Sequence, residues 1–154
     1  MAAPNRHIVV VEDAIALAEA AAERLIERIE ANHGRVAICM TGGSSPKRLY
    51  ELLATEPWRS EIPWDRVHWF IGDDRFVPSG DPLNNMTMAR TAFLDACAPL
   101  ANVHPIKTDA ASPNEAAALY ARELQSFYGT DKLDKAKPLF DLCLLYTSPS
   151  PRDS

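Results

Sequence analysis

The sequence lacks the features that mark several broad classes of protein. None of its apolar runs is long enough to span a bilayer, and Met1–Arg6 contains no apolar segment of the signal-peptide type. Its three cysteines, Cys39, Cys97 and Cys143, are odd in number and show no Cys-x-x-Cys spacing, which argues against a disulfide framework or a zinc site. We therefore expect a cytoplasmic protein that does not interact with membranes.

An excess of basic residues is absent too. The 154 residues include 16 Lys and Arg against 21 Asp and Glu, which gives a formal net charge of −5. A mildly acidic chain has no general attraction for nucleic acid, and any site for a phosphate must be built locally. With 47% hydrophobic residues, the chain is long enough for one domain with a core and too short for two.

Apolar runs alternate with helical patterns along the chain. Strands are predicted at His7–Val11, Arg35–Met40, Val67–Ile71, Asn102–Ile106 and Leu139–Leu145. Helices are predicted after Asp13, over Lys47–Ala54, over Asn84–Cys97 and after Ser112. This alternation predicts a Rossmann-like α/β fold, with a mostly parallel sheet and helices on both faces. Ligands bind such sheets outside the carboxyl ends of the strands.

The helix after Asp13 has clear ends and a clear buried face. Asp13 can cap its start, and Gly34 is the natural place for it to stop. Its apolar face is formed by Ile15, Ala18, Ala22, Leu25, Ile26 and Ile29.

The first loop suited to chemistry is Thr41–Pro46, between an apolar strand and a helix. Its glycines and hydroxyl residues are Thr41, Gly42, Gly43, Ser44 and Ser45. The glycines let the backbone approach a ligand, and the amides at the start of the next helix form an anion site suited to a sugar phosphate. Lys47 and Arg48 could supply positive charge. A tight β–α turn with a serine cap explains the same residues, because the P-loop spacing is absent.

The second such loop is Gly72–Pro78, which follows the Val67–Ile71 strand. Arg75 could clamp a phosphate or carboxylate with two hydrogen bonds, and Asp73 or Asp74 could orient a sugar hydroxyl or a water. In the alternative interpretation Asp73 caps a turn and Asp74 pairs with Arg75 at the surface, where such pairs contribute little.

The four histidines give no sign of a metal site. No two of them have the spacing of metal ligands, so a structural role is expected for each. They are His7, His33, His68 and His104.

Two segments resemble the signatures of a known family. Residues 39–54, CMTGGSSPKRLYELLA, are similar to the sugar-phosphate loop of the 6-phosphogluconolactonases, within the glucosamine-6-phosphate isomerase/6-phosphogluconolactonase family. Residues 64–94 resemble the second signature, Asp-Glu-Arg-x-Val-Pro followed by Ser-Asn-x-x-Met. Asp74 stands here in place of the glutamate and Asn84 in place of the serine. The resemblance covers His7–Leu142.

The resemblance implies hydrolysis of 6-phospho-D-glucono-1,5-lactone to 6-phosphogluconate, in the oxidative branch of the pentose phosphate pathway. It implies catalytic roles for Asp73 and Arg75. It implies substrate binding by Thr41, Gly42, Gly43, Ser44, Ser45, Asp74 and Asn85. No metal or organic cofactor is implied. The implied partner is the small-molecule lactone, and we expect the full-length parent to be a monomer.

The end of the sequence departs from this pattern. After Leu142 the chain continues as CLLYTSPSPRDS, which resembles one reading frame of a widely used transposon-type sequencing adapter. We therefore expect residues 1–142 to be a partial lactonase-like domain, truncated at its C-terminal side, and residues 143–154 to be a non-native tail.

The truncation has a consequence for catalysis. In the resembled family, a strand like Phe140–Leu142 continues into a Gly-Asp-Gly-His-Thr-Ala-Ser type motif, whose histidine is the favoured general base. This chain has Tyr146–Pro149 at that place and no histidine after His104. We therefore expect the fragment itself to be inactive.

Three alternatives remain open at this point. The chain could come from a phosphosugar isomerase or deaminase of the same fold. It could be a non-catalytic module that binds phosphosugars. It could also be a subdomain whose missing histidine comes from a partner chain, although nothing in the sequence argues for that.

Overall fold

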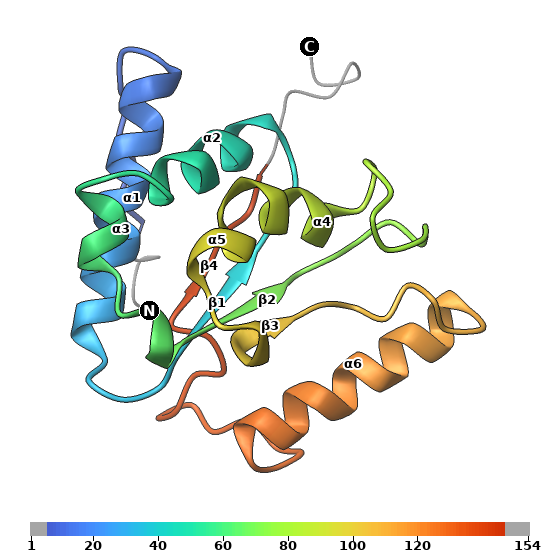
Figure 1. The fold of residues 1–154 in the computed structure, drawn as a ribbon. Coiled ribbons are helices and arrows are strands. Elements are labelled where there is room, and N and C mark those ends of the chain that lie inside the picture. The colour runs from blue at the N-terminus through green and yellow to red at the C-terminus, as the bar shows by residue number, and fades with distance from the viewer. Residues whose placement is uncertain (1–5, 147–154) are drawn as a thin grey trace.

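The protein is described by a computed structural model that covers residues 6–146. Four parallel strands form one sheet in the order β3–β2–β1–β4 (Figure 1). The strands are β1 Val36–Met40, β2 Val67–Ile71, β3 Val103–His104 and β4 Leu142–Cys143. The α-helices are α1 Ala14–Ala31, α2 Ser44–Leu53, α3 Trp58–Glu61, α4 Asn85–Ala89, α5 Asp95–Cys97 and α6 Pro113–Tyr128. A π-helical turn, Arg90–Leu94, joins α4 to α5, and short 3₁₀ turns lie at Trp64–Arg66 and Leu100–Asn102.

The two central strands form the core of the sheet. They pair in register from Val36 with Val67 to Met40 with Ile71, and all five residues of β1 are buried. Burial on both faces explains why β1 is a continuous apolar run rather than an alternating one.

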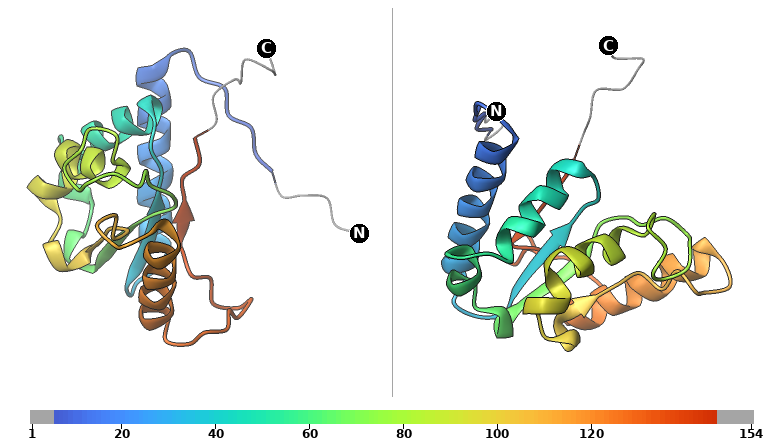
Figure 2. Two further views of the ribbon diagram at one scale, coloured as in Figure 1. Left: turned by 90° about the vertical axis from the view of Figure 1, so that its right-hand side faces the viewer. Right: turned by 45° about the horizontal axis from the view of Figure 1, so that its top comes forward.

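Helices cover both faces of the sheet, which confirms the predicted fold class (Figure 2). Trp69 of β2 packs edge-on against Phe93, in the segment between α4 and α5, with ring centroids 5.0 Å apart. Its neighbour Phe70 packs against Tyr120 and Phe127 of α6. Because successive strand residues point to opposite faces, α6 lies on the side of the sheet opposite Phe93.

Side chains cap three helices, and two of these caps, at Asp13 and Ser112, were predicted from the sequence. The Asp13 side chain accepts a hydrogen bond from the amide of Ala16, and that of Asn84 accepts one from Thr87, both at 2.8 Å. Ser112 caps α6 in the same way. The helix predicted over 84–97 is present as the continuous run from α4 to α5.

The strand predicted at His7–Val11 is wrong. Residues 6–11 form no helix or strand, and Ile8, Val9 and Val10 are 79%, 73% and 89% exposed. An apolar run becomes a strand only where a sheet edge pairs with its backbone, and none of the four described strands does so.

Two details of the first helix also differ from expectation. Ile15 is 66% exposed, because the packed part of α1 begins one turn later, at Ala18. The helix ends at Ala31 with Asn32 as its C-cap, and Gly34 does not adopt the left-handed conformation of a stop signal. The Asn32 side chain instead accepts the amide of Gly34.

Asp141 fastens β4 to the rest of the sheet. Its carboxylate accepts hydrogen bonds from the amide of Ala37 at 2.8 Å and from Nδ2 of Asn32 at 2.9 Å. The strand continues past Leu142, since the amide of Leu144 donates to the carbonyl of Cys39 at 2.8 Å. The adapter-like stretch therefore begins inside β4, and residues 147–154 of it lie outside the described part of the chain. No described helix is both long and apolar enough to cross a membrane.

A chain of polar side chains joins α6 to the sheet. Nδ1 of His68 lies 2.9 Å from Nε2 of His104, and Nδ1 of His104 lies 2.8 Å from a carboxylate oxygen of Glu123. Both hydrogen bonds are satisfied when Nδ1–H of His68 donates to Nε2 of His104 and Nδ1–H of His104 donates to Glu123. Burial, with the nearby charges of His104 and Arg35, lowers the pKa of His68 to about 4.

This lowered pKa predicts a pH-dependent stability. Above pH 6.5, the ordinary pKa of histidine, His68 is neutral in both states and its contribution is complete. As the pH falls from 6.5 towards 4, the unfolded chain takes up the proton first, so the free energy of unfolding should fall. His68→Asn, which keeps a donor towards His104 and does not titrate, should lack this part of the decrease in urea denaturation. An equal decrease in the free energy of unfolding with falling pH in both proteins would contradict the lowered pKa of His68.

Candidate functional site

The two loops singled out in the sequence lie side by side. Because β1 and β2 are parallel and in register, their carboxyl ends lie at the same edge of the sheet. The amide of Gly72, just after β2, donates to the carbonyl of Met40, the last residue of β1, at 2.9 Å. The loop that starts at Thr41 and the loop that starts at Gly72 therefore begin next to each other.

The first loop gives α2 an open N-terminus. The helix begins at Ser44, three residues before the predicted start, with Gly43 as its N-cap at φ 117° and ψ 167°. Essentially only glycine adopts that conformation. No side chain caps the helix, so its first amides have no partner from a capping side chain. The uncapped N-terminus of a helix of ten residues, such as α2, attracts an anion.

Asn85 links the two loops. Its Nδ2 donates to the backbone carbonyl of Asp73 at 3.3 Å. Its amide group also lies against Gly42, so closely that a Cβ at Gly42 would stand 2.8 Å from that Nδ2. Gly42 is therefore required by the close approach of Asn85, whereas Gly43 is required by its backbone conformation.

Between the loops lies a cleft of about 320 Å³. Its lining residues are Gly43, Ser44, Lys47, Arg75, Pro82, Leu83, Asn85 and Met88. Lys47 and Arg75 are its charged residues, and neither forms an ion pair with any described residue. Two cations beside an uncapped helix N-terminus make this cleft suited to a phosphate or a similar anion.

Four predicted site residues meet in the cleft: Gly43, Ser44, Arg75 and Asn85. Lys47, considered only as a source of charge, lines it as well, and Arg48 does not. The apolar residues of the lining, Pro82, Leu83 and Met88, were not among the predicted site residues. Met88 was nonetheless signalled, because it is the methionine of the second signature.

Asp74 faces the protein rather than the cleft. One carboxylate oxygen accepts the amides of Arg75 at 2.8 Å and Asn85 at 2.6 Å, and the other accepts the amide of Met86 at 3.2 Å. The side-chain pairing of Asp74 with Arg75 considered from the sequence is not what the structure contains, because Asp74 binds the backbone of Arg75.

Asp73 lies on another side of the same loop. It lines a second cavity, of about 370 Å³, together with Phe76, Tyr120 and other residues of α6. Its backbone carbonyl nevertheless belongs to the link between the loops through Asn85. The catalytic role predicted for Asp73 thus concerns a residue outside the lining of the cleft, joined to it through Asn85.

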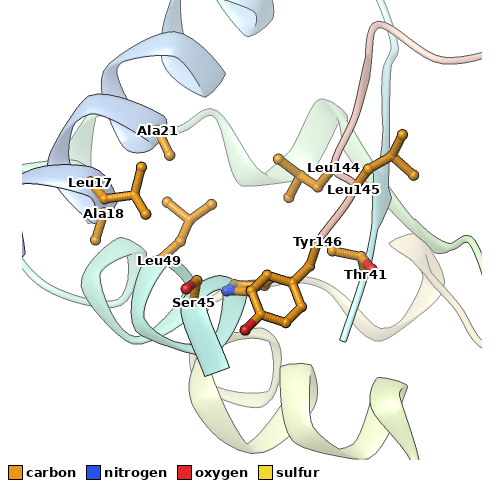
Figure 3. A pocket seen from close by; sticks show the side chains of 10 residues that line it. Leu17, Ala18, Ala21, Thr41, Ser45, Leu49, Leu144, Leu145 and Tyr146 are labelled. Carbon is orange, nitrogen blue, oxygen red and sulfur yellow. The ribbon is translucent and has the colours of Figure 1, made fainter. Parts of the chain in front are cut away.

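Thr41 and Ser45 line neither of these cavities. The hydroxyl of Tyr50 accepts the amide of Thr41 at 3.0 Å and donates to its carbonyl at 2.6 Å. Both Thr41 and Ser45 border an apolar pocket between α1, α2 and the segment after β4. Figure 3 shows it between Leu17, Ala18, Ala21 and Leu49 on one side and Leu144, Leu145 and Tyr146 on the other. The last three lie in the stretch after Leu142, and this pocket contains no charged side chain.

The described residues contain no group of three or more His, Cys, Asp or Glu that could hold a metal ion. None of the four histidines, all within the described residues, lines the cleft. The cleft therefore offers cations and backbone amides for an anion, and no imidazole that could act on a substrate.

An α/β fold with a cleft at the carboxyl edge of its parallel sheet, lined by Lys47 and Arg75, defines the broad class of this protein. Comparison with known proteins makes it specific. The family described as "Glucosamine-6-phosphate isomerases/6-phosphogluconolactonase" matches residues 12–147. The chain belongs to this family, which confirms the resemblance found in the sequence.

Individual relatives agree. The chain is 41% identical over 121 residues to a 6-phosphogluconolactonase of Synechocystis, which covers 78% of the chain and 48% of that protein. It is 38% identical over 151 residues to the 6-phosphogluconolactonase of Streptomyces coelicolor, covering 92% and 57%. The structure of 6-phosphogluconolactonase from Trypanosoma cruzi superposes with a TM-score of 0.70 at 27% identity, covering 82% and 52%. The chain thus spans about half the length of these relatives.

The contact between Gly42 and Asn85 gives a prediction. Gly42→Ala should lower the free energy of unfolding by about 1–3 kcal/mol, because the added methyl overlaps the Asn85 amide. Asn85→Ala removes one hydrogen bond and should cost about 1 kcal/mol. The double variant should be no less stable than Asn85→Ala alone, because the overlap is gone. Chemical denaturation measures all three, and simple additivity would show that the two residues do not touch.

Proposed function

We propose that this chain is part of a 6-phosphogluconolactonase, which hydrolyses 6-phospho-D-glucono-1,5-lactone to 6-phosphogluconate. The observation that supports this most is the cleft, where the uncapped N-terminus of α2 meets Lys47 and Arg75. The names of the relatives point to the same substrate.

In this proposal the cleft binds the phosphate of the lactone. The amides at Gly43 and Ser44 approach the phosphate oxygens, and Arg75 and Lys47 neutralise their charge. A fixed phosphate restricts the position of the sugar ring, which lowers the entropic cost of reaction. Asn85 keeps the two loops together while the substrate is bound.

Hydrolysis also requires a base that activates water and donors that stabilise the oxyanion. No histidine lines the cleft, and His68 and His104 are engaged with α6 on the side of the sheet opposite Phe93. Asp73, which is joined to the cleft through Asn85, remains the proposed residue for orienting the ring or the water. The chain accordingly contains the proposed anion-binding part of the site, and we propose that it does not hydrolyse the lactone by itself.

The remaining proposals follow from the sequence. Residues 143–154 are proposed to be non-native, and the full-length parent is proposed to be a cytoplasmic monomer without nucleic-acid or membrane partners. All three cysteines are free thiols, which is consistent with a reducing compartment.

The proposal is tested by recovering the uninterrupted gene and reading the codons after Leu142. A Gly-x-Asp-Gly-His-like segment is expected there. The protein it encodes should hydrolyse the lactone at an ordinary enzymatic rate, and the 154-residue chain should not. Arg75→Gln in the parent should raise KM more than it lowers kcat, because it removes a contact to the phosphate.

Two outcomes favour other functions. Action of the parent on glucosamine 6-phosphate and not on the lactone would indicate an isomerase or deaminase. Source DNA that truly ends in CLLYTSPSPRDS, with tight binding of 6-phosphogluconate by the chain, would indicate a binding module.

A further inference from the structure

Two helices begin beside the cleft, and their N-termini differ. The first amides of α4 are all engaged by side chains: those of Asn85 and Met86 donate to Asp74, and that of Thr87 donates to Asn84. The N-terminus of α2 has no side-chain cap. An anion in the cleft therefore finds available amides at α2 and not at α4.

The carboxylate of Asp74 is engaged mainly by the backbone rather than directed into the cleft. Both of its oxygens accept backbone amides, at 2.6, 2.8 and 3.2 Å, from Arg75 and from the first two residues of α4. Hydrogen bonds to a charged acceptor are among the stronger ones in proteins. They tie the loop after β2 to the start of α4 at the residue next to Arg75.

This tie determines where the neighbouring side chains lie. With the Asp74 carboxylate bound to the start of α4, Arg75 lines the cleft with Gly43, Ser44 and Lys47, while Asp73 and Asp74 both border the cavity beside α6. Arg75 forms no hydrogen bond or ion pair through its guanidinium to any described residue. Its position over the cleft therefore depends on its backbone, which Asp74 holds.

We propose that Asp74 is a positioning residue, which fastens the loop after β2 to α4 and thereby holds Arg75 at the phosphate subsite, and that it does not bind substrate itself. This rests on the proposed function, since it assumes that the cleft binds the phosphate. It departs from the sequence-based prediction that Asp74 contacts the substrate.

Charge and position make opposite predictions for Asp74→Asn. Removing a negative charge beside an anion site should by itself strengthen anion binding. If Asp74 holds Arg75 in place, binding should instead weaken, because an asparagine has one acceptor oxygen and its NH₂ group opposes the amides of α4. The sign of the change in affinity thus distinguishes the effect of the lost charge from the effect of the lost position of Arg75.

The experiment titrates 6-phosphogluconate and inorganic phosphate into the 154-residue chain, followed by calorimetry and by amide hydrogen exchange. The variants are Asp74→Asn, Asp74→Glu, Arg75→Gln and the double variant Asp74→Asn/Arg75→Gln. Asp109→Asn, an exposed carboxylate in the loop before α6, is the control for loss of one charge.

Asp74→Asn should weaken both ligands about tenfold and accelerate exchange of the Asn85 and Met86 amides. Asp74→Glu keeps a carboxylate and introduces the residue that the family usually has at this position. Its affinity should lie within about threefold of that of the unmodified 154-residue chain. In the Arg75→Gln background, Asp74→Asn should have no further effect on affinity, because the residue through which it acts is gone.

Several results would overturn the proposal. These are unchanged or tighter binding by Asp74→Asn, an equal loss in the Arg75→Gln background, or a tenfold loss in Asp74→Glu. If the unmodified 154-residue chain binds neither ligand, the proposed function fails and this inference fails with it. If the unmodified 154-residue chain binds both ligands and Asp74→Asn binds them equally well, only the positioning role fails.

Discussion

The parallel pairing of β1 with β2 is the interaction on which the rest of the structure depends. Five residue pairs in register bring Thr41 and Gly72 to the same edge of the sheet, and the bond from the Gly72 amide to the Met40 carbonyl fixes their separation. Two loops that are some 30 residues apart in sequence thereby form the two walls of one cleft. Antiparallel pairing would place them at opposite ends of the sheet.

Three consecutive charged residues after β2 make different contacts, although Asp73 and Asp74 border the same cavity. Asp73 borders the cavity beside α6, Asp74 binds the start of α4, and Arg75 enters the cleft. A sequence motif of this kind is easily taken as three substrate contacts. The structure instead separates a residue that borders the cavity beside α6, a carboxylate that binds backbone amides of α4, and a cation that lines the cleft.

Local patterns were enough to predict much of the fold. The caps at Asp13 and Ser112 follow from short-range hydrogen bonding, and the apolar runs at β1 and β2 follow from burial. The adjacency of the two loops followed from the rule for parallel sheets. These features depend on residues close in sequence or on one general rule of topology.

The features that the sequence did not indicate depend on distant contacts. The run His7–Val11 has good strand propensity but no paired edge among the described strands. The orientations of Asp73 and Asp74 are set by α6 and α4, and that of Thr41 by the hydroxyl of Tyr50. No pattern within either loop contains that information.

The central claim is that the cleft between the two loops binds the phosphate. The most direct measurement is an NMR titration of the isotope-labelled 154-residue chain with 6-phosphogluconate, with gluconate as the control that lacks the phosphate. The account predicts shifts at Gly43, Ser44 and the Arg75 guanidinium, with 6-phosphogluconate only. Shifts confined to the cavity of Asp73 and Tyr120, or equal shifts with gluconate, would contradict it.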